Sequence, residues 1–200
     1  ENKVILDLSK KFPDLKIIID ESFIHFIDDL ESWKIFKTKL LKNKNYFFVK
    51  SMSKDFGIAG LRIGYLETKN KIINTLKESF GTWSLNNFAV EFLDIMSNDK
   101  FLINYENARK KYIRDKKIFY NELKKINSIK VFDSDSNFFL IKLNRIETSG
   151  FEMAMKLLIS SGLYIRSMED KIGLNSSFIR VASRSKKENK KIAKILTSLL

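Results

Sequence analysis

The chain has 200 residues, of which 44% are hydrophobic and 30% are charged, so it can bury a sizeable core in one or two ordered domains. The absence of cysteine excludes disulfides, thiolate zinc sites and cysteine nucleophiles, and the single histidine, His25, cannot alone supply a metal cluster or a serine-type triad. The formal net charge of +13 would suit a basic nucleic-acid-binding module, which we keep as a remote alternative. The lysines are scattered over helix-like stretches, however, so we expect no nucleic-acid partner.

The sequence also lacks the usual signs of a membrane or secreted protein. No apolar run approaches the roughly 20 residues that a membrane span requires, and the first residues, ENKVILDLSKK, lack the apolar core of a secretory signal. A chain without cysteine fits a reducing compartment. We therefore expect a cytoplasmic protein with no membrane partner.

In residues 1–85, helix-like and strand-like patterns alternate. Apolar residues at helical spacing predict a helix over residues 1–12, and a second helix is expected over 31–42. Apolar runs predict a short buried strand at KIIID (16–20) and two further strands at YFFVKS (46–51) and LRIGYLE (61–67). The alternation predicts an α/β fold in which this part forms a three-layer domain with a mainly parallel sheet.

The remainder, residues 86–200, is predicted to form a smaller α/β domain at the C-terminus. The boundary is placed near residue 85, after the turn GTWSLNN, because longer helical patterns begin there. Helices are expected in this domain over 87–98, 104–126, 150–161 and from 186 onward, and a further helix is expected before it, over 69–79. Strands are expected over 129–132, 137–143, 164–168 and 178–183.

The stretch SMSKDFGIAGLRIGY, residues 51–65, concentrates chemistry on a predicted turn between two strands. Lys54 is flanked by the hydroxyls of Ser51 and Ser53, and nearby glycines permit tight or left-handed backbone. Hydroxyls and the guanidinium of Arg62 suit a bound phosphate. The Walker pattern GxxxxGK[ST] is absent, which disfavours a nucleotide clamp and leaves a charge clamp or a Schiff-base lysine.

This stretch closely resembles the cofactor-lysine segment of fold-type I pyridoxal-phosphate enzymes, in the aminotransferase class I/II group that includes histidinol-phosphate aminotransferase and threonine-phosphate decarboxylase. The family pattern, roughly SxSKxxGxxGxRxGY, is matched at every fixed position. The resemblance implies that the chain binds pyridoxal 5′-phosphate (PLP). It also implies that Lys54 forms a Schiff base with the cofactor and that Ser51, Ser53 and Arg62 hold its phosphate. The alternative is a lysine that caps a loop, with glycines serving turns.

A second segment of the resemblance is IIIDESFIHF. Asp20 ends a predicted strand, where a buried carboxylate needs a cationic or hydrogen-bonded partner. In the family the corresponding aspartate pairs with the pyridine nitrogen of the cofactor. Phe23 stands where many aminotransferases carry a tyrosine that donates to the phenolic oxygen of the cofactor, and phenylalanine cannot donate. This departure makes DESFIHFI more similar to the decarboxylase branch.

The resemblance also implies a substrate-binding arginine. Arg180 in FIRVASRS lies between Ile179 and Val181 on a predicted strand, and it aligns with the family arginine that binds the substrate α-carboxylate. Arg166 and Arg184 are expected to be solvated or paired. The segment that includes Trp83 resembles one that reaches the dimer interface, so we expect a homodimer.

Two expectations concern the whole enzyme. The resemblance begins in the middle of the family's large domain, so we interpret the 200 residues as a C-terminal portion that binds cofactor weakly and turns over poorly alone. The expected activity is transamination between an amino acid or amino-alcohol phosphate and a 2-oxo acid, as in histidinol-phosphate aminotransferase. The alternatives are a decarboxylase of the threonine-phosphate decarboxylase type and a cofactor-free part that acts by association.

Overall fold

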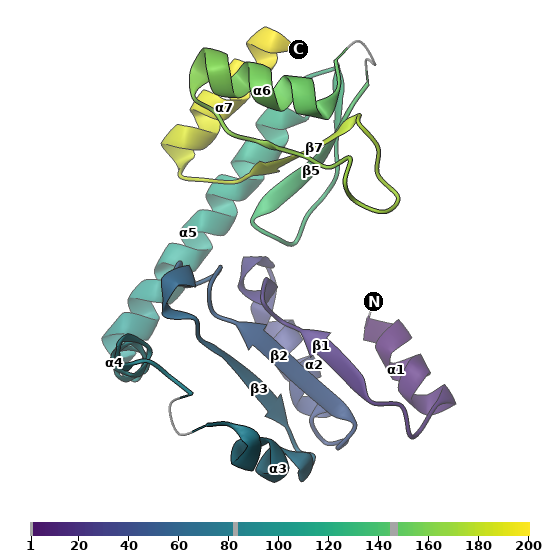
Figure 1. The fold of residues 1–200 in the computed structure, drawn as a ribbon, viewed down its shortest axis with the longest axis vertical. Helices are drawn as coiled ribbons and strands as arrows, with labels where there is room; N and C mark the ends of the chain where they lie inside the picture. The colour runs from purple at the N-terminus through teal and green to yellow at the C-terminus, as the bar shows by residue number, and fades with distance from the viewer. Residues whose placement is uncertain (1, 82–83, 145–147) are drawn as a thin grey trace. The chain divides into compact units, whose positions relative to one another are not determined.

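The computed structural model describes residues 2–81, 84–144 and 148–200, which form two compact units that divide between Glu106 and Asn107 (Figure 1). Trp83 lies outside the described residues. Among the helices of the described part, none is both long enough and apolar enough to cross a membrane. The cytoplasmic location stays a prediction.

The first unit contains a three-stranded sheet in the order β1-β2-β3, with β2 between its neighbours (Figure 1). Strands β1 and β2 pair in parallel, whereas β2 and β3 pair antiparallel. The strands are β1 (Ile17–Asp20), β2 (Tyr46–Ser51) and β3 (Gly64–Thr68), and the helices are α1 (Asn2–Lys11), α2 (Leu30–Leu40), α3 (Ile72–Ser79) and α4 (Asn87–Met96). Two short 3-10 turns, η1 (Ile24–Phe26) and η2 (Ala59–Leu61), follow β1 and precede β3.

The first-unit core lies between β1, β2 and the first two helices. Tyr46, Phe48 and Leu40 are nearly fully buried, and side chains of α1 and α2 pack against them. The side chain of Asp29 begins α2 by accepting a hydrogen bond from the Ser32 backbone amide. This packing fixes the two strands whose ends carry the candidate site.

The second unit is built on a four-stranded antiparallel sheet in the order β4-β5-β7-β6. Its core joins the inward faces of the sheet to three helices, and Leu157, Ile179 and Leu196 are fully buried in it. The strands are β4 (Ile129–Val131), β5 (Phe138–Leu143), β6 (Arg166–Ser167) and β7 (Phe178–Ala182), and the helices are α5 (Asp99–Leu123), which starts in the first unit, α6 (Gly150–Ser161) and α7 (Lys186–Leu199).

The α/β class is confirmed, but two details differ from the sequence-based expectation. The described part of the first sheet is mixed rather than mainly parallel, because β1 pairs with β2 in parallel whereas β3 pairs with β2 antiparallel. The strand at 16–20 is also not fully buried, since Ile18 is 70% exposed.

The compact units divide later in the chain than the expected boundary near residue 85. Helix α4 belongs with the first unit because Ala89 is fully buried against Met52 and Ile63, with Phe92 and Met96 packed beside them. The assignment of residues 86–200 as the small domain of the complete enzyme stays a prediction.

Replacing Leu157 with alanine should lower the free energy of unfolding by about 3 kcal/mol, because it removes a fully buried side chain from a close-packed core. The matched control is Leu158→Ala on the same helix, where the side chain is 40% exposed and the expected loss is under about 1 kcal/mol. Urea unfolding followed by circular dichroism measures both. Equal losses would contradict the assignment of this helix face to the core.

Candidate active site

The predicted cofactor residues lie at one end of the first sheet. Asp20, the last residue of β1, stands opposite Val49 in the parallel register, and Ser51, the last residue of β2, stands opposite Gly64. Because parallel strands place their carboxyl ends at the same edge of a sheet, Asp20 and the segment that follows Ser51 share that edge. The fold therefore brings together residues that are far apart in the sequence.

A chain of hydrogen bonds links Asp20 to the serines of the motif. The hydroxyl and the backbone amide of Ser22 both donate to Asp20 Oδ1, at 2.6 and 2.8 Å. The Ser22 hydroxyl accepts from the backbone amide of Ser51 at 3.0 Å, and the Ser51 hydroxyl donates to Ser53 at 3.0 Å. Sequence reasoning missed Ser22, although a serine two residues after an aspartate is typical of an Asx-type turn. Its hydroxyl orients the carboxylate.

Lys54 lies on the turn immediately after these serines. Its side chain is exposed, and its amine has no hydrogen-bond or ion-pair partner among the described residues. Gly57 adopts a left-handed conformation with φ +69°, and a Cβ at Gly64 would lie 2.5 Å from the Lys50 carbonyl oxygen. These two glycines are required by the backbone, as expected, whereas Gly60 shows neither a positive φ nor a close neighbour.

Arg62 is in the left-handed region, with φ 55° and ψ 45°, and it is the one non-glycine residue with positive φ in the described part of the chain. This conformation costs about 1–2 kcal/mol for an L-residue. The side chain is exposed, and its Nη1 donates to the Ala59 carbonyl oxygen at 3.0 Å. Its other donors can still bind an anion.

Phe23 directly precedes the 3-10 turn η1, and its ring lies 6.2 Å from the ring of Phe26. The side chain is partly buried. Its predicted position beside the cofactor stays a prediction, and it offers no donor there.

Arg180 lies on β7 in the second unit, where its guanidinium stacks over the Phe138 ring at 4.8 Å. Among the described residues it has no acidic partner, so its charge is available to an anion. Arg180 belongs to the second unit, whereas Asp20 and Lys54 belong to the first. The other two arginines considered are paired as expected, in Arg166–Asp170 at 2.9 Å and Arg184–Glu188 at 3.2 Å.

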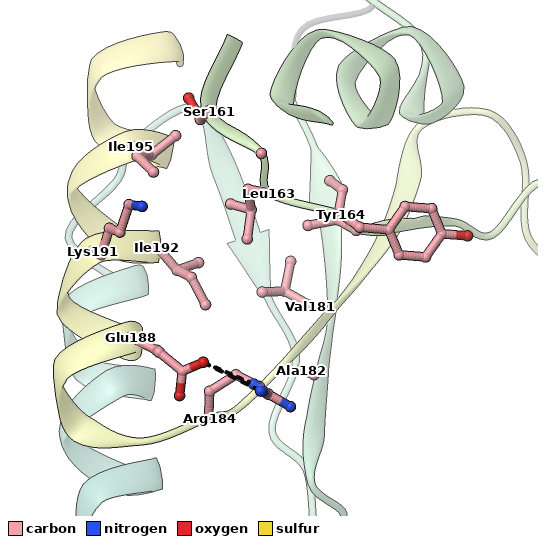
Figure 2. Close-up of a pocket in the computed structure, with 12 residues that line it drawn as sticks. Ser161, Leu163, Tyr164, Val181, Ala182, Arg184, Glu188, Lys191, Ile192 and Ile195 are labelled. Atoms are coloured by element: carbon pink, nitrogen blue, oxygen red, sulfur yellow. Dashed lines mark hydrogen bonds and ion pairs between the residues drawn. The ribbon is translucent and has the colours of Figure 1, made fainter. Parts of the chain in front are cut away.

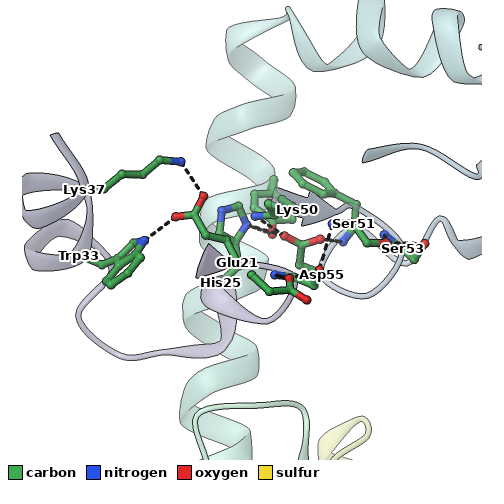
Figure 3. A network of polar contacts seen from close by, with 12 residues as sticks. Glu21, His25, Trp33, Lys37, Lys50, Ser51, Ser53 and Asp55 are labelled. Carbon is green, nitrogen blue, oxygen red and sulfur yellow. Dashed lines mark hydrogen bonds and ion pairs between the residues drawn. The ribbon is translucent and has the colours of Figure 1, made fainter. Parts of the chain in front are cut away.

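A buried carboxylate directly follows Asp20. Glu21 is 3% exposed and accepts from Trp33 Nε1 at 2.6 Å and from Lys37 Nζ at 2.5 Å (Figure 3). Lys37 also pairs with Glu67 on β3 at 2.8 Å. Burial disfavours the charged form of Lys37, but the bonds to Glu21 and Glu67 outweigh it and raise the pKa of Lys37 above its usual value.

The second unit contains a separate cavity of about 360 Å³ between α7, β7 and the segment after α6 (Figure 2). Leu163, Ile192 and Ile195 supply apolar walls, and the Arg184–Glu188 ion pair lies at one end. Its described lining contains none of the predicted site residues. We assign it no part in the chemistry of the site.

Comparison with known proteins decides the family. The family model described as aminotransferase class I and II matches residues 2–198. This chain belongs to that family. PLP is the cofactor of the family, as the motif at Lys54 implies.

Three relatives show the range of activities among similar proteins. The chain is 40% identical to L-serine phosphate decarboxylase of Sulfurospirillum multivorans, over 92% of this chain and 47% of the relative, and 38% identical to that of Campylobacter jejuni, over 89% and 46%. It is 32% identical to histidinol-phosphate aminotransferase from Clostridium acetobutylicum, whose crystal structure matches with a TM-score of 0.84. That match covers 98% of this chain and 57% of the other. The chain spans about half the length of the curated relatives it matches.

The residues at the sheet edge fit PLP chemically. Lys54 supplies an exposed amine that can condense with an aldehyde, and Asp20 supplies a carboxylate that can pair with a ring nitrogen. The serine hydroxyls and Arg62 are donors that a phosphate requires. The roles of the individual residues stay predictions.

Replacing Lys37 with methionine should lower the free energy of unfolding by about 3 kcal/mol near pH 8, because it leaves the Glu21 carboxylate buried without its cation. A raised folded-state pKa means that the Lys37 contribution is complete below its usual value of 10.5 and is lost as the pH rises through the folded-state value. Urea unfolding of the wild type and of Lys37→Met, measured from pH 8 to pH 12, should therefore show that their free energies of unfolding become more similar above pH 10.5.

The matched control is Lys34→Met on the same helix, because Lys34 is 58% exposed and pairs with an exposed glutamate. Its effect should be under about 1 kcal/mol at every pH. A Lys37→Met effect that is equally small, or that stays constant to pH 12, would contradict the buried pairing.

Proposed function

We propose that the complete protein is a PLP-dependent decarboxylase that acts on a phosphorylated amino acid, with L-serine phosphate as the first substrate to test. The observation that carries the proposal is the identity of 40% and 38% to two L-serine phosphate decarboxylases, against 32% to a histidinol-phosphate aminotransferase. Transamination was the first expectation from the sequence, and these relatives support the decarboxylase alternative better. Phe23, which departs from the tyrosine of many aminotransferases, agrees with it.

Both reactions place the same demands on the residues of this chain. When bound, PLP withdraws electrons from the substrate α-carbon. Asp20 would hold a proton at the pyridine nitrogen, which its orientation by Ser22 supports. Ser51, Ser53 and Arg62 would bind the cofactor phosphate.

Lys54 would hold the cofactor through its amine and, once displaced by the amine of the substrate, deliver a proton to the α-carbon as CO₂ leaves. Arg180 would bind an anionic group of the substrate, in keeping with a guanidinium that has no acidic partner among the described residues. For decarboxylation the bond to the carboxylate must break, whereas for transamination the α-proton must move. The proposed partners are the phosphorylated amino acid and a second copy of the chain, and a 2-oxo acid is needed only for transamination.

The complete protein, loaded with PLP and mixed with L-serine phosphate, should release one CO₂ and one ethanolamine phosphate per substrate, with one proton taken up. Lys54→Ala should lower the rate by about 10²–10⁴-fold because the amine and the proton donor are both lost. Lys69→Ala, which removes an exposed lysine on the same unit, is the matched control and should keep the rate.

Amino-group transfer from the same substrate to a 2-oxo acid without CO₂ release would contradict the proposal and support transamination. Borohydride treatment followed by peptide mass spectrometry should find the cofactor fixed to Lys54. A label absent from Lys54 would contradict its role in either reaction.

A further inference from the structure

A buried ion pair lies directly beneath the turn that carries Lys54. Lys50 on β2 and Asp55 on the turn are in contact through Nζ and Oδ2 at 2.7 Å, and their side chains are 2% and 0% exposed. Asp55 is the residue next to Lys54, whose own side chain is exposed. The two neighbours therefore differ completely in their surroundings.

Asp55 is held by more than Lys50. His25 Nδ1 lies 3.1 Å from the same Oδ2 (Figure 3). The same nitrogen lies 2.6 Å from the Tyr105 hydroxyl, and the Phe56 backbone amide donates to Asp55 Oδ1 at 3.0 Å. The Phe56 ring stacks on Tyr105 at 4.4 Å. Contacts from β2 and from the turn η1 thus converge on one carboxylate within the first unit, and Tyr105 of α5 contacts the His25 side chain that lies beside it.

Burying the Lys50–Asp55 ion pair costs desolvation free energy, which offsets much of what the pair contributes to the stability of the fold. Burial lowers the pKa of Lys50 and raises the pKa of Asp55, in each case against their mutual attraction. Replacing a buried ion pair by apolar side chains of similar volume is often neutral or stabilising, so burial of the pair calls for another explanation. Directional contacts fix the geometry of a carboxylate more tightly than apolar packing does.

Lys54 depends on its backbone for its position. Its amine has no partner among the described residues, so no side-chain contact holds it. Among the described residues, its two chain neighbours are both held: Ser53 by its hydrogen bond to Ser51, and Asp55 by the buried contacts of its carboxylate. A shift of that carboxylate would move the turn and with it the amine.

We propose that Asp55, through its buried pair with Lys50, is a positioning residue that sets where the Lys54 amine stands. The inference rests on the proposed role of Lys54 and adds a residue to it. It holds for decarboxylation and for transamination alike, because both begin with the cofactor on Lys54.

The test compares cofactor attachment in the complete protein and its variants without any substrate. PLP is added to cofactor-free protein, borohydride fixes what has condensed, and peptide mass spectrometry gives the label on Lys54 relative to Lys69. Asp55→Asn breaks the pair, whereas the double variant Lys50→Met with Asp55→Leu replaces it by apolar side chains. Asp170→Asn, the same chemical change at an exposed pair, is the matched control.

We expect the double variant to keep the melting temperature of the wild type while its preference for Lys54 over Lys69 falls at least tenfold. Asp55→Asn should show the same loss of preference, and Asp170→Asn should show none. A double variant that labels Lys54 as selectively as the wild type would overturn the inference, because the pair would then serve stability alone.

Two further outcomes are decisive. Wild-type protein with no label on Lys54 would overturn the proposed function together with this inference, whereas an equally selective double variant overturns only the inference. If neither variant folds, Asp55→Glu decides, since it keeps the charge but displaces the carboxylate by one methylene. It should lower the Lys54 preference, and an unchanged preference would overturn the inference.

Discussion

The parallel pairing of β1 with β2 is the constraint on which the candidate site depends. It places the ends of both strands at one edge of the sheet, with Asp20 opposite Val49 and Ser51 two residues further on. The hydroxyl of Ser22 then joins the two strand ends through short hydrogen bonds. Any other register would separate the carboxylate of Asp20 from the turn that carries Lys54.

A second feature recurs at Asp20 and Lys54, the two candidate catalytic residues. Each is exposed and is followed at once by a carboxylate whose side chain is buried and forms an ion pair with a lysine of a neighbouring segment. The two sets are Asp20 with Glu21 and Lys37, and Lys54 with Asp55 and Lys50. Buried ion pairs contribute little net stability compared with apolar packing, but they are lost at high cost when one partner is removed. Asp20 and Lys54, which are exposed, thus each lie directly beside a buried ion pair.

The sequence predicts most of the elements and the chemistry of the motif, because both are local. YFFVKS coincides with β2, and the turn glycine Gly57 has the positive φ that its motif requires. Ser22 has a local signal, the Asx-type turn after Asp20, but the roles of Glu21 and Asp55 could not be predicted because they depend on distant partners such as Trp33 and His25. The antiparallel β3 and the packing of α4 on the first unit could not be predicted for the same reason, since strand direction and the burial of Ala89 are tertiary properties.

Membership of the aminotransferase class I and II family accounts for the cofactor and leaves the reaction to residues around the substrate. If Asp20 and Lys54 face the same bound cofactor, a crystal structure of the complete protein with PLP should show both contacts. We expect an Asp20 carboxylate oxygen about 3 Å from the pyridine nitrogen and the Lys54 amine bonded to the aldehyde carbon. A cofactor bound with either residue turned away from it would disprove the shared site.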